Sequence, residues 1–162
     1  MDTYNSEMTE AEEKEDRFLT FDLGSERYGI IINQVTEIIG LQTINKLPDM
    51  PDYIKGIINL RGTIIPVIDM GIKFRKQKRD YTDRTCIIVV ETQELTAGLI
   101  VDNVAEVMQI KDIAPPPGLT ASSGAKYING VGKINGDVVV LIDCEQLFNN
   151  QEALLIKASE SM

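Results

Sequence analysis

The chain of 162 residues contains no histidine. Histidine is the commonest general base and metal ligand, and it is the usual phosphate acceptor of relay proteins. No serine or cysteine stands in a sequence context typical of a nucleophile. Lysine, aspartate and glutamate could still catalyse a reaction, but nothing in the chain indicates that they do. We therefore expect a binding module that is not an enzyme and that holds no cofactor or metal.

Cysteine is scarce, with Cys86 and Cys144 the two in the chain. Their spacing matches neither a metal motif nor a redox pair. Both lie at or beside apolar runs, so we expect buried free thiols rather than a disulfide or a nucleophile.

Long apolar runs are also missing. No run reaches the length of about 20 residues that a membrane-spanning helix needs, and the N-terminus lacks the apolar region of a signal peptide. The sequence therefore predicts a cytoplasmic protein without direct membrane insertion.

The net charge of −9 is distributed unevenly. Residues 1–16 carry seven acidic side chains and one lysine, which gives −6 and leaves −3 for the rest of the chain. This tail has too few apolar residues to pack and reads as disordered. The remaining part is nearly neutral, so the low pI says little about binding partners.

The chain contains one pattern twice. Residues 53–69 return as 127–143 at an offset of 74 residues, and residues 29–39 return as 98–108 at an offset of 69. Each unit spans about 60 to 70 residues, which suits a small barrel. A unit of this size is marginal alone, so we expect the two units to share a core.

Short runs rich in isoleucine and valine alternate with turn residues, a pattern typical of β-strands. A single helical turn is expected at residues 33–35, and a helix is expected to follow Asp143 as its N-cap and to continue in broken form to about residue 158. We expect strands near residues 17–22, 27–32, 36–41, 56–60 and 63–68, and near 85–91, 95–101, 105–110, 127–134 and 137–142. The fold class is therefore mostly β, with two five-stranded barrels and a short C-terminal helix.

The two copies differ at a hairpin tip. The second copy has Asn135-Gly136, the pair that two-residue turns of the primed type prefer, whereas the first has Arg61-Gly62. Arginine adopts a positive φ less readily than asparagine. We therefore interpret Arg61 as a partner-binding residue that could hold a carboxylate or backbone carbonyls, with a solvated turn residue as the alternative.

Pro66 stands in a strand where its counterpart is Val140. Proline cannot donate to a strand ladder, so the strand is expected to be an edge or to bulge there. Such an edge could be kept open for a partner or be protected against aggregation. Glu37 and Glu106 match between the copies, which favours a shared solvent-facing position, with Glu37 a candidate for the rim of an interface.

A basic run at residues 73–79 raises the alternative of nucleic-acid binding by a double barrel. The run falls between the two units and contains one aromatic residue, Phe74, whose counterpart Phe148 indicates core packing. We therefore favour a linker and expect no nucleic-acid partner.

The block from Gly56 to Asp69, with Asn-Leu-Arg-Gly followed by Pro-Val-Ile-Asp, resembles the CheW family of bacterial chemotaxis adaptors. The likeness extends from Arg17 to Phe148 and includes residues 18–24 and 35–38. It implies two SH3-like five-stranded barrels, no enzymatic activity and no cofactor. We place the CheW-like domain at residues 17–150, with barrels at about 17–80 and 81–150, an exchange of strands between them allowed, and a C-terminal helix and tail at 151–162.

The resemblance also implies two partners, the regulatory domain of the histidine kinase CheA and the cytoplasmic tip of chemoreceptors. The expected assembly is a monomer recruited into receptor–kinase arrays at the membrane. Residues on the partner-binding region of the first unit would be Val35, Glu37, Gly56, Asn59 and Arg61. Two residues of the second unit, Ile87 and Val107, would help to line an apolar groove between the barrels. A CheW relative that serves another kinase pathway remains an alternative.

Overall fold

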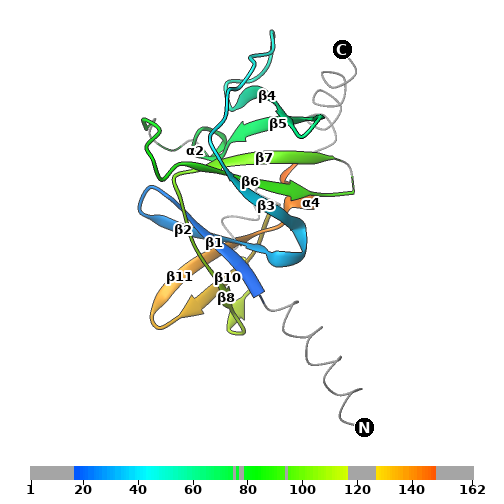
Figure 1. Ribbon diagram of the computed structural model, residues 1–162. Helices are drawn as coiled ribbons and strands as arrows, with labels where there is room; N and C mark the ends of the chain where they lie inside the picture. Colours follow the sequence, from blue (N-terminus) through cyan, green and yellow to red (C-terminus); the bar gives the residue numbers. More distant parts are fainter. Residues whose placement is uncertain (1–16, 75, 77–78, 94, 117–126, 149–162) are drawn as a thin grey trace.

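The computed structural model describes residues 17–74, 76, 79–93, 95–116 and 127–148. The expected acidic tail and the segment 151–162 lie outside these residues. Two sheets make up most of the described chain and face each other (Figure 1). The fold is mostly β with two SH3-like subdomains, as predicted.

One sheet has six strands in the order β8-β1-β2-β11-β10-β9. Its strands are β1 (Arg17–Leu23), β2 (Glu26–Ile31), β8 (Asn103–Gln109), β9 (Ile113–Ala114), β10 (Ile128–Ile134) and β11 (Asp137–Ile142). The neighbours pair in antiparallel fashion except β2 and β11, which are parallel.

The other sheet has five strands in the order β3-β6-β7-β5-β4. Its strands are β3 (Val35–Gly40), β4 (Ile54–Leu60), β5 (Thr63–Asp69), β6 (Cys86–Glu91) and β7 (Thr96–Val101). Three short helical segments follow strands: η1 (Ile32–Gln34), α2 (Met70–Lys73) and α4 (Cys144–Leu147).

The repeat explains why the two sheets have the same order. At the offsets of 69 and 74 residues, β3-β6-β7-β5-β4 corresponds strand by strand to β8-β1-β2-β11-β10. The registers also agree, since Ile39 pairs with Ile87 in one sheet and Met108 pairs with Phe18 in the other. The two subdomains are therefore copies of one strand arrangement.

The first hairpin of each unit lies in the sheet of the other unit. Strands β1 and β2 join the six-stranded sheet with β8, β10 and β11, while β6 and β7 join the five-stranded sheet. The sheets consequently divide the chain into 35–101 on one side and 17–31 plus 103–142 on the other. The contiguous boundaries 17–80 and 81–150 do not coincide with this division.

The main core cluster joins both sheets, as expected for two marginal units. Phe21, Leu23 and Ile30 from the six-stranded sheet pack with Ile88 and Leu99 from the five-stranded sheet, and all five side chains are buried. Each sheet also has a smaller cluster of its own. Aliphatic burial of this extent is the main stabilising term of such a fold.

Aromatic rings from distant parts of the chain form a column within this core. Phe74 stacks on Tyr127 with ring centroids 5.0 Å apart and contacts Tyr28 at 5.3 Å, and Tyr28 stacks on Phe21. The prediction that Phe74 and Phe148 pack in the core is confirmed, with Phe148 buried and Phe74 half-buried.

Pro66 does not lie on an edge strand, which corrects the prediction. β5 is an inner strand between β7 and β4. However, the pairing of β5 with β7 runs only from Val67 to Asp69, so Pro66 precedes that ladder and needs no amide hydrogen on that side. The bulge falls in β4, between Ile54 and Gly56, rather than at the proline.

Most predicted strands are present, and two short elements were missed. The two-residue strand β9 and the four-residue helix α2 are too short to produce a periodic signal. Asp143 accepts a hydrogen bond of 3.0 Å from the Glu145 amide, so its predicted capping role is confirmed, and its counterpart Asp69 likewise accepts one of 3.1 Å from the Ile72 amide. The predicted continuation of the last helix to residue 158 lies outside the described residues.

Both thiols are free. Burial raises the pKa of the Cys144 thiol to about 12, whereas Cys86 is only half-buried, which corrects the expectation that both are buried. Burial also raises the pKa of Cys86, so neither group is an activated nucleophile.

Candidate partner-binding surface

The β4–β5 turn holds Arg61 in a left-handed conformation. Its φ is 52°, close to the 50° of its counterpart Asn135, and the glycines that follow have φ values of 90° and 84°. Both turns are thus of the primed type that the repeat predicts. The first copy therefore has arginine at a backbone position that favours asparagine, which indicates a role for the Arg61 side chain itself.

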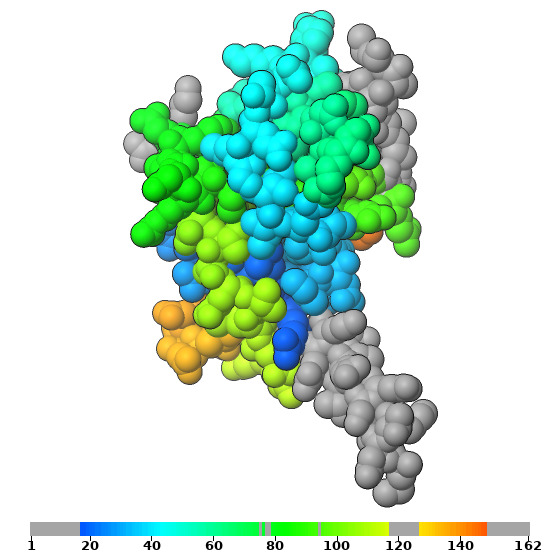
Figure 2. Space-filling model, viewed as in Figure 1, coloured from blue at the N-terminus to red at the C-terminus, as the bar shows by residue number. Residues whose placement is uncertain are grey.

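The guanidinium of Arg61 pairs with Glu37 of β3. Its Nη1 donates to Glu37 Oε1 at 3.1 Å, and Nη2 donates to Oε2. The Arg61 side chain remains 69% exposed, and that of Glu37 31%. The guanidinium holds the pKa of the Glu37 carboxyl below its usual range. The structure therefore brings two of the sequence-predicted residues together at the surface, and Figure 2 shows the β4–β5 hairpin beside β3.

A bulge in β3 presents Glu37. The pairing of β3 with β6 shifts between Val35 and Glu37, and the Thr36 hydroxyl donates to the carbonyl of Val89 at 3.1 Å. Val35 is half-buried against the main core, while Ile38 is 45% exposed. β3 therefore offers an acidic and an apolar side chain next to Arg61.

Two of the predicted residues shape the hairpin instead of presenting a side chain. Asn59 Oδ1 accepts a hydrogen bond of 2.7 Å from the Gly62 amide, which closes the turn beneath Arg61. Gly56 is buried with a φ of 145°, and a Cβ there would stand 2.0 Å from the carbonyl oxygen of Asn45. Its role is to let the loop that contains Asn45 pair with Ile57.

Ile87 and Val107 are not brought together at a surface. The Ile87 side chain is fully buried in the inner cluster of the five-stranded sheet with Ile58 and Val67, so it does not line a groove as expected. Val107 on β8 is 46% exposed. The sequence could not separate these two, because isoleucine and valine in short strands look alike whether they face the core or the solvent.

Ile38, Ile64 and Val138 are exposed apolar residues that were not among the predicted site residues. Ile38 corresponds to Val107, and Ile64 on β5 corresponds to Val138 on β11, and all four are at least 41% exposed. Their pairing by the repeat was the available signal, since an apolar residue kept at the same place in both copies without burial indicates a surface contact. Each subdomain thus presents one apolar side chain on an edge strand and one on a hairpin.

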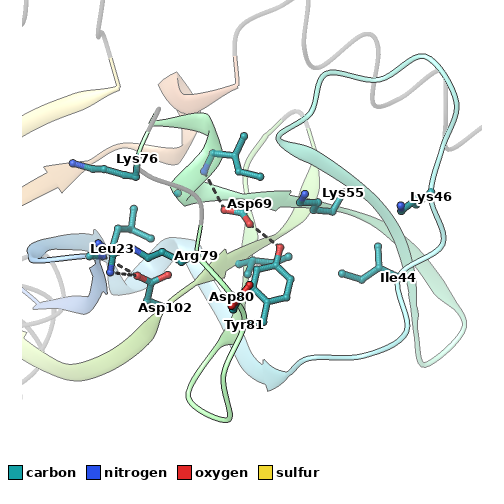
Figure 3. Close-up of a pocket in the computed structure, with 14 residues that line it drawn as sticks. Leu23, Ile44, Lys46, Lys55, Asp69, Lys76, Arg79, Asp80, Tyr81 and Asp102 are labelled. Carbon is teal, nitrogen blue, oxygen red and sulfur yellow. Dashed lines mark hydrogen bonds and ion pairs between the residues drawn. The ribbon is translucent and has the colours of Figure 1, made fainter.

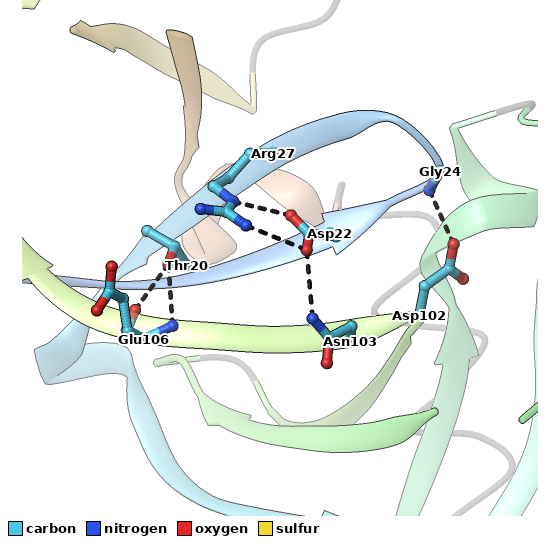
Figure 4. Close-up of polar contacts among 7 residues, drawn as sticks. All are labelled: Thr20, Asp22, Gly24, Arg27, Asp102, Asn103 and Glu106. Carbon is cyan, nitrogen blue, oxygen red and sulfur yellow. Dashed lines mark hydrogen bonds and ion pairs between the residues drawn. The ribbon is translucent and has the colours of Figure 1, made fainter. Parts of the chain in front are cut away.

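The second subdomain presents its matching glutamate without an arginine. Thr20 is buried, and its hydroxyl makes hydrogen bonds with both backbone groups of Glu106. It donates to the carbonyl at 2.7 Å and accepts from the amide at 3.2 Å (Figure 4). This occurs at the bulge between β1 and β8. Asn135 replaces the guanidinium at the turn, so the pair of Arg61 and Glu37 belongs to one subdomain only.

Arg27 and Asp22 of the β1–β2 hairpin pair with each other. Arg27 donates to both carboxylate oxygens of Asp22, at 2.8 and 3.3 Å, and Asn103 donates to the same carboxylate at 3.3 Å (Figure 4). The hydrogen bond from Arg27 is the main cause of the lowered pKa of Asp22.

The described residues of the basic run also contact the protein itself. Lys73 lies over the Tyr53 ring, Lys76 pairs with Glu26, and Arg79 Nη1 lies 3.6 Å from Asp102 Oδ2. The cations among the described residues of the run are thus engaged within the protein, which favours its interpretation as a linker.

The described residues contain no group of three or more acidic, cysteine or histidine side chains arranged to hold a metal ion. No helix among them is both long and apolar enough to span a membrane.

Comparison with known proteins gives a consistent result. The family model described as a CheW-like domain matches residues 17–152. A chemotaxis protein CheW from Klebsiella aerogenes is 36% identical over 86% of this chain and 85% of its own, and one from Treponema pallidum is 34% identical over 84% of each.

A solved structure agrees with these relatives. The crystal structure of the scaffolding protein TtCheW from Thermoanaerobacter tengcongensis is 38% identical, has a TM-score of 0.77, and covers 85% of this chain and 94% of that one. CheW proteins are non-catalytic adaptors, so the prediction that the chain is not an enzyme agrees with its relatives. The chain belongs to the CheW family of chemotaxis scaffold proteins.

Proposed function

We propose that this protein couples the histidine kinase CheA to chemoreceptors, and that the surface around Arg61 and Glu37 binds at least one of the two. The observation that carries the proposal is the exposed ion pair between these residues, flanked by the exposed apolar side chains of Ile38 and Ile64. Interfaces favour an arginine anchor beside apolar side chains, with polar groups at the rim.

The rigidity of this surface supports the proposal. The primed turn, the Asn59 hydrogen bond and the contact with Glu37 hold the guanidinium in place before a partner arrives. Preorganisation of this kind lowers the entropic cost of association. Arginine also presents donors that remain available after Glu37 is bound, because it has five and the carboxylate takes two.

Within this proposal the protein is a cytoplasmic monomer that joins arrays of receptors and kinase at the membrane. The pseudo-symmetry of the two subdomains fits such an assembly, since a chain with two related surfaces can contact two neighbours at once. Val107 and Val138 would then serve the second contact.

The test is a titration of fluorescently labelled protein with the regulatory domain of CheA and, separately, with a receptor cytoplasmic hairpin. Arg61→Glu should weaken at least one complex by about tenfold or more, because it places two like charges at the contact. The matched control is Arg84→Glu, at an exposed arginine in the connection between β5 and β6. Unchanged affinity for both partners in Arg61→Glu contradicts the proposal.

A further inference from the structure

A pocket of about 350 Å³ lies between the two sheets, away from the Arg61–Glu37 surface (Figure 3). Leu23 at the end of β1 and Ile100 of β7 form its buried apolar base, and Ile44 and Ile72 add partly exposed apolar walls. Its volume falls at the lower end of the range for ligand sites, about 300 to 1,000 Å³. The question is whether the pocket is a packing defect or a site.

The repeat supplies an internal comparison, because two side chains of the other half make hydrogen bonds that their counterparts beside the pocket do not make. The counterpart of Gly71 in α2 is Glu145 in α4, and the carboxylate of Glu145 accepts a hydrogen bond of 2.9 Å from the Gln93 amide in the β6–β7 turn. Gly71 has no side chain that could accept a hydrogen bond from the β1–β2 turn. The amide of Gly24 in that turn donates instead to Asp102, at 2.8 Å.

A second closing contact is also absent on the pocket side. In the other half, Gln34 donates to Asp143 at 3.0 Å and accepts from the Cys144 amide at 3.1 Å. The counterpart of Gln34 is Asn103, which is one methylene shorter and donates to Asp22. The side of the pocket beside Asp69 therefore lacks the two side-chain contacts that Glu145 and Gln34 make around Asp143.

Tyr81, from the connection between β5 and β6, lies at this opening. Its hydroxyl donates to Asp69 Oδ2 at 2.7 Å, and its side chain is 44% exposed. Burial and the adjacent carboxylate raise the pKa of Tyr81, so it stays a neutral donor. The ring thus adds an aromatic wall and a polar group at the mouth of the pocket.

Two lysines of the pocket supply positive charge that could hold an anion. Among the acids of the lining, Asp102 lies 3.6 Å from Arg79, Asp69 accepts hydrogen bonds from Tyr81 and the Ile72 amide, and Asp80 is exposed. Lys46 and Lys55 line the pocket, and neither makes an ion pair or hydrogen bond within the described part of the chain. Lys55 points inward toward Tyr81 and Asp69 in Figure 3, whereas Lys76 points away.

We propose that this pocket binds a small organic anion with an apolar body, the anionic group held by Lys55 with Lys46 and the body placed on Leu23 and Ile100. Apolar walls supply most of the affinity of such sites, and a few polar groups fix the orientation of the ligand. The pocket shares no residue with the Arg61–Glu37 surface, so its test is independent of the proposed function.

The experiment uses the full chain and the dye anilinonaphthalene sulfonate, which combines apolar rings with one anionic group. The dye should bind at one equivalent with a rise in fluorescence, octanoate should displace it, and the uncharged octanol should not. Lys55→Gln should weaken binding by roughly tenfold through loss of a charged hydrogen bond. The matched control is Lys133→Gln, at an exposed lysine of β10 outside the pocket, and it should leave binding unchanged.

A second variant tests the comparison between the halves. Gly71→Glu copies Glu145 and should abolish dye binding by closing the pocket; the Cβ itself needs only a small shift of Asp69, whose Oδ1 it would meet at 3.2 Å. Three outcomes overturn the proposal: equal dye affinity in wild type and Lys55→Gln, retained dye binding in folded Gly71→Glu, or the lack of saturable binding.

If Gly71→Glu does not fold, NMR of the wild-type protein decides. The amide chemical-shift changes that octanoate induces should centre on Gly24, Ile72 and Ile100, and changes centred elsewhere overturn the proposal.

Discussion

Arg61 and Glu37 form a two-pronged ion pair that joins the β4–β5 turn to the edge strand β3, while their counterparts Asn135 and Glu106 have no such charge pairing. The backbone of the two turns is nearly identical, with φ values of 52° and 50°. At this pair of equivalent positions the duplicated scaffold keeps its backbone but differs in side-chain chemistry, and the difference is exposed.

The first prediction concerns the pKa of Glu37. NMR titration of its carboxyl should give a value below the usual one for glutamate, about 4.3, and Arg61→Gln should return it to that range. Because the folded-state pKa is depressed, the stabilisation from the pair is present above the unfolded pKa and is lost as the pH falls through the folded one. An unchanged titration in Arg61→Gln would show that the pair does not form in solution.

A second prediction separates the glycines of the first hairpin. Gly56→Ala should destabilise the protein by about 3 kcal/mol or more, because the new Cβ collides with the backbone of Asn45 at a positive φ. Gly62→Ala has open space around it and should cost only about 1 kcal/mol for its φ of 90°. Urea unfolding measures both, and equal losses would refute the assigned role of Gly56.

The bulges in β3 and β8 are each supported by a threonine hydroxyl, and the difference between these hydroxyls gives a third prediction. Thr20→Val should cost about 2 kcal/mol, since the buried hydroxyl serves both the amide and the carbonyl of Glu106. Thr36→Val removes one bond at an exposed position and should cost less than about 1 kcal/mol. Thermal and chemical unfolding of the two variants compare them, and the reverse order would contradict the account.

The fourth prediction concerns acid stability. Asp22→Asn should lower the free energy of unfolding by about 1 kcal/mol at neutral pH, because it breaks the pair with Arg27. The pKa of Asp22 is depressed, so its contribution fades as the pH falls below the usual carboxyl value of about 3.9, and the two proteins should converge there. Urea unfolding of wild type and Asp22→Asn at neutral pH and at a pH below the usual carboxyl pKa tests this, with Asp83→Asn at an exposed position as the control. A difference in the free energy of unfolding that persists in acid argues against the prediction.

Local features of the sequence predicted the strands well. The Asn-Gly and Arg-Gly pairs identify the hairpin turns, and Asp143 identifies a helix cap, since each feature depends on residues a few positions apart. The exposed guanidinium of Arg61 was predicted from the mismatch between the copies and the surface position of Glu37 from its match with Glu106, although not their mutual contact.

Features that depend on distant residues were not predictable in this way. The placement of β1 and β2 in the opposite sheet involves pairings across more than 70 residues, and the sequence pattern of a strand does not record its partner. Ile87 was assigned to an apolar groove by the family resemblance, whereas its burial depends on Ile58 and Val67 of other strands. Gly71 lines the pocket without a side chain, and the strand pattern gave no sign that its counterpart Glu145 would bind the opposite turn.

The five-stranded sheet occupies one continuous stretch, 35–101, whereas the hairpin of β1 and β2 pairs further with strands from 103–142. During synthesis the opening hairpin therefore leaves the ribosome first and meets its neighbours last, and pairings between such distant segments form slowly. Until β8 and β11 emerge, neither outer edge of the β1–β2 hairpin has its neighbouring strand. A nascent chain stalled before that point is one that aggregates or occupies a chaperone.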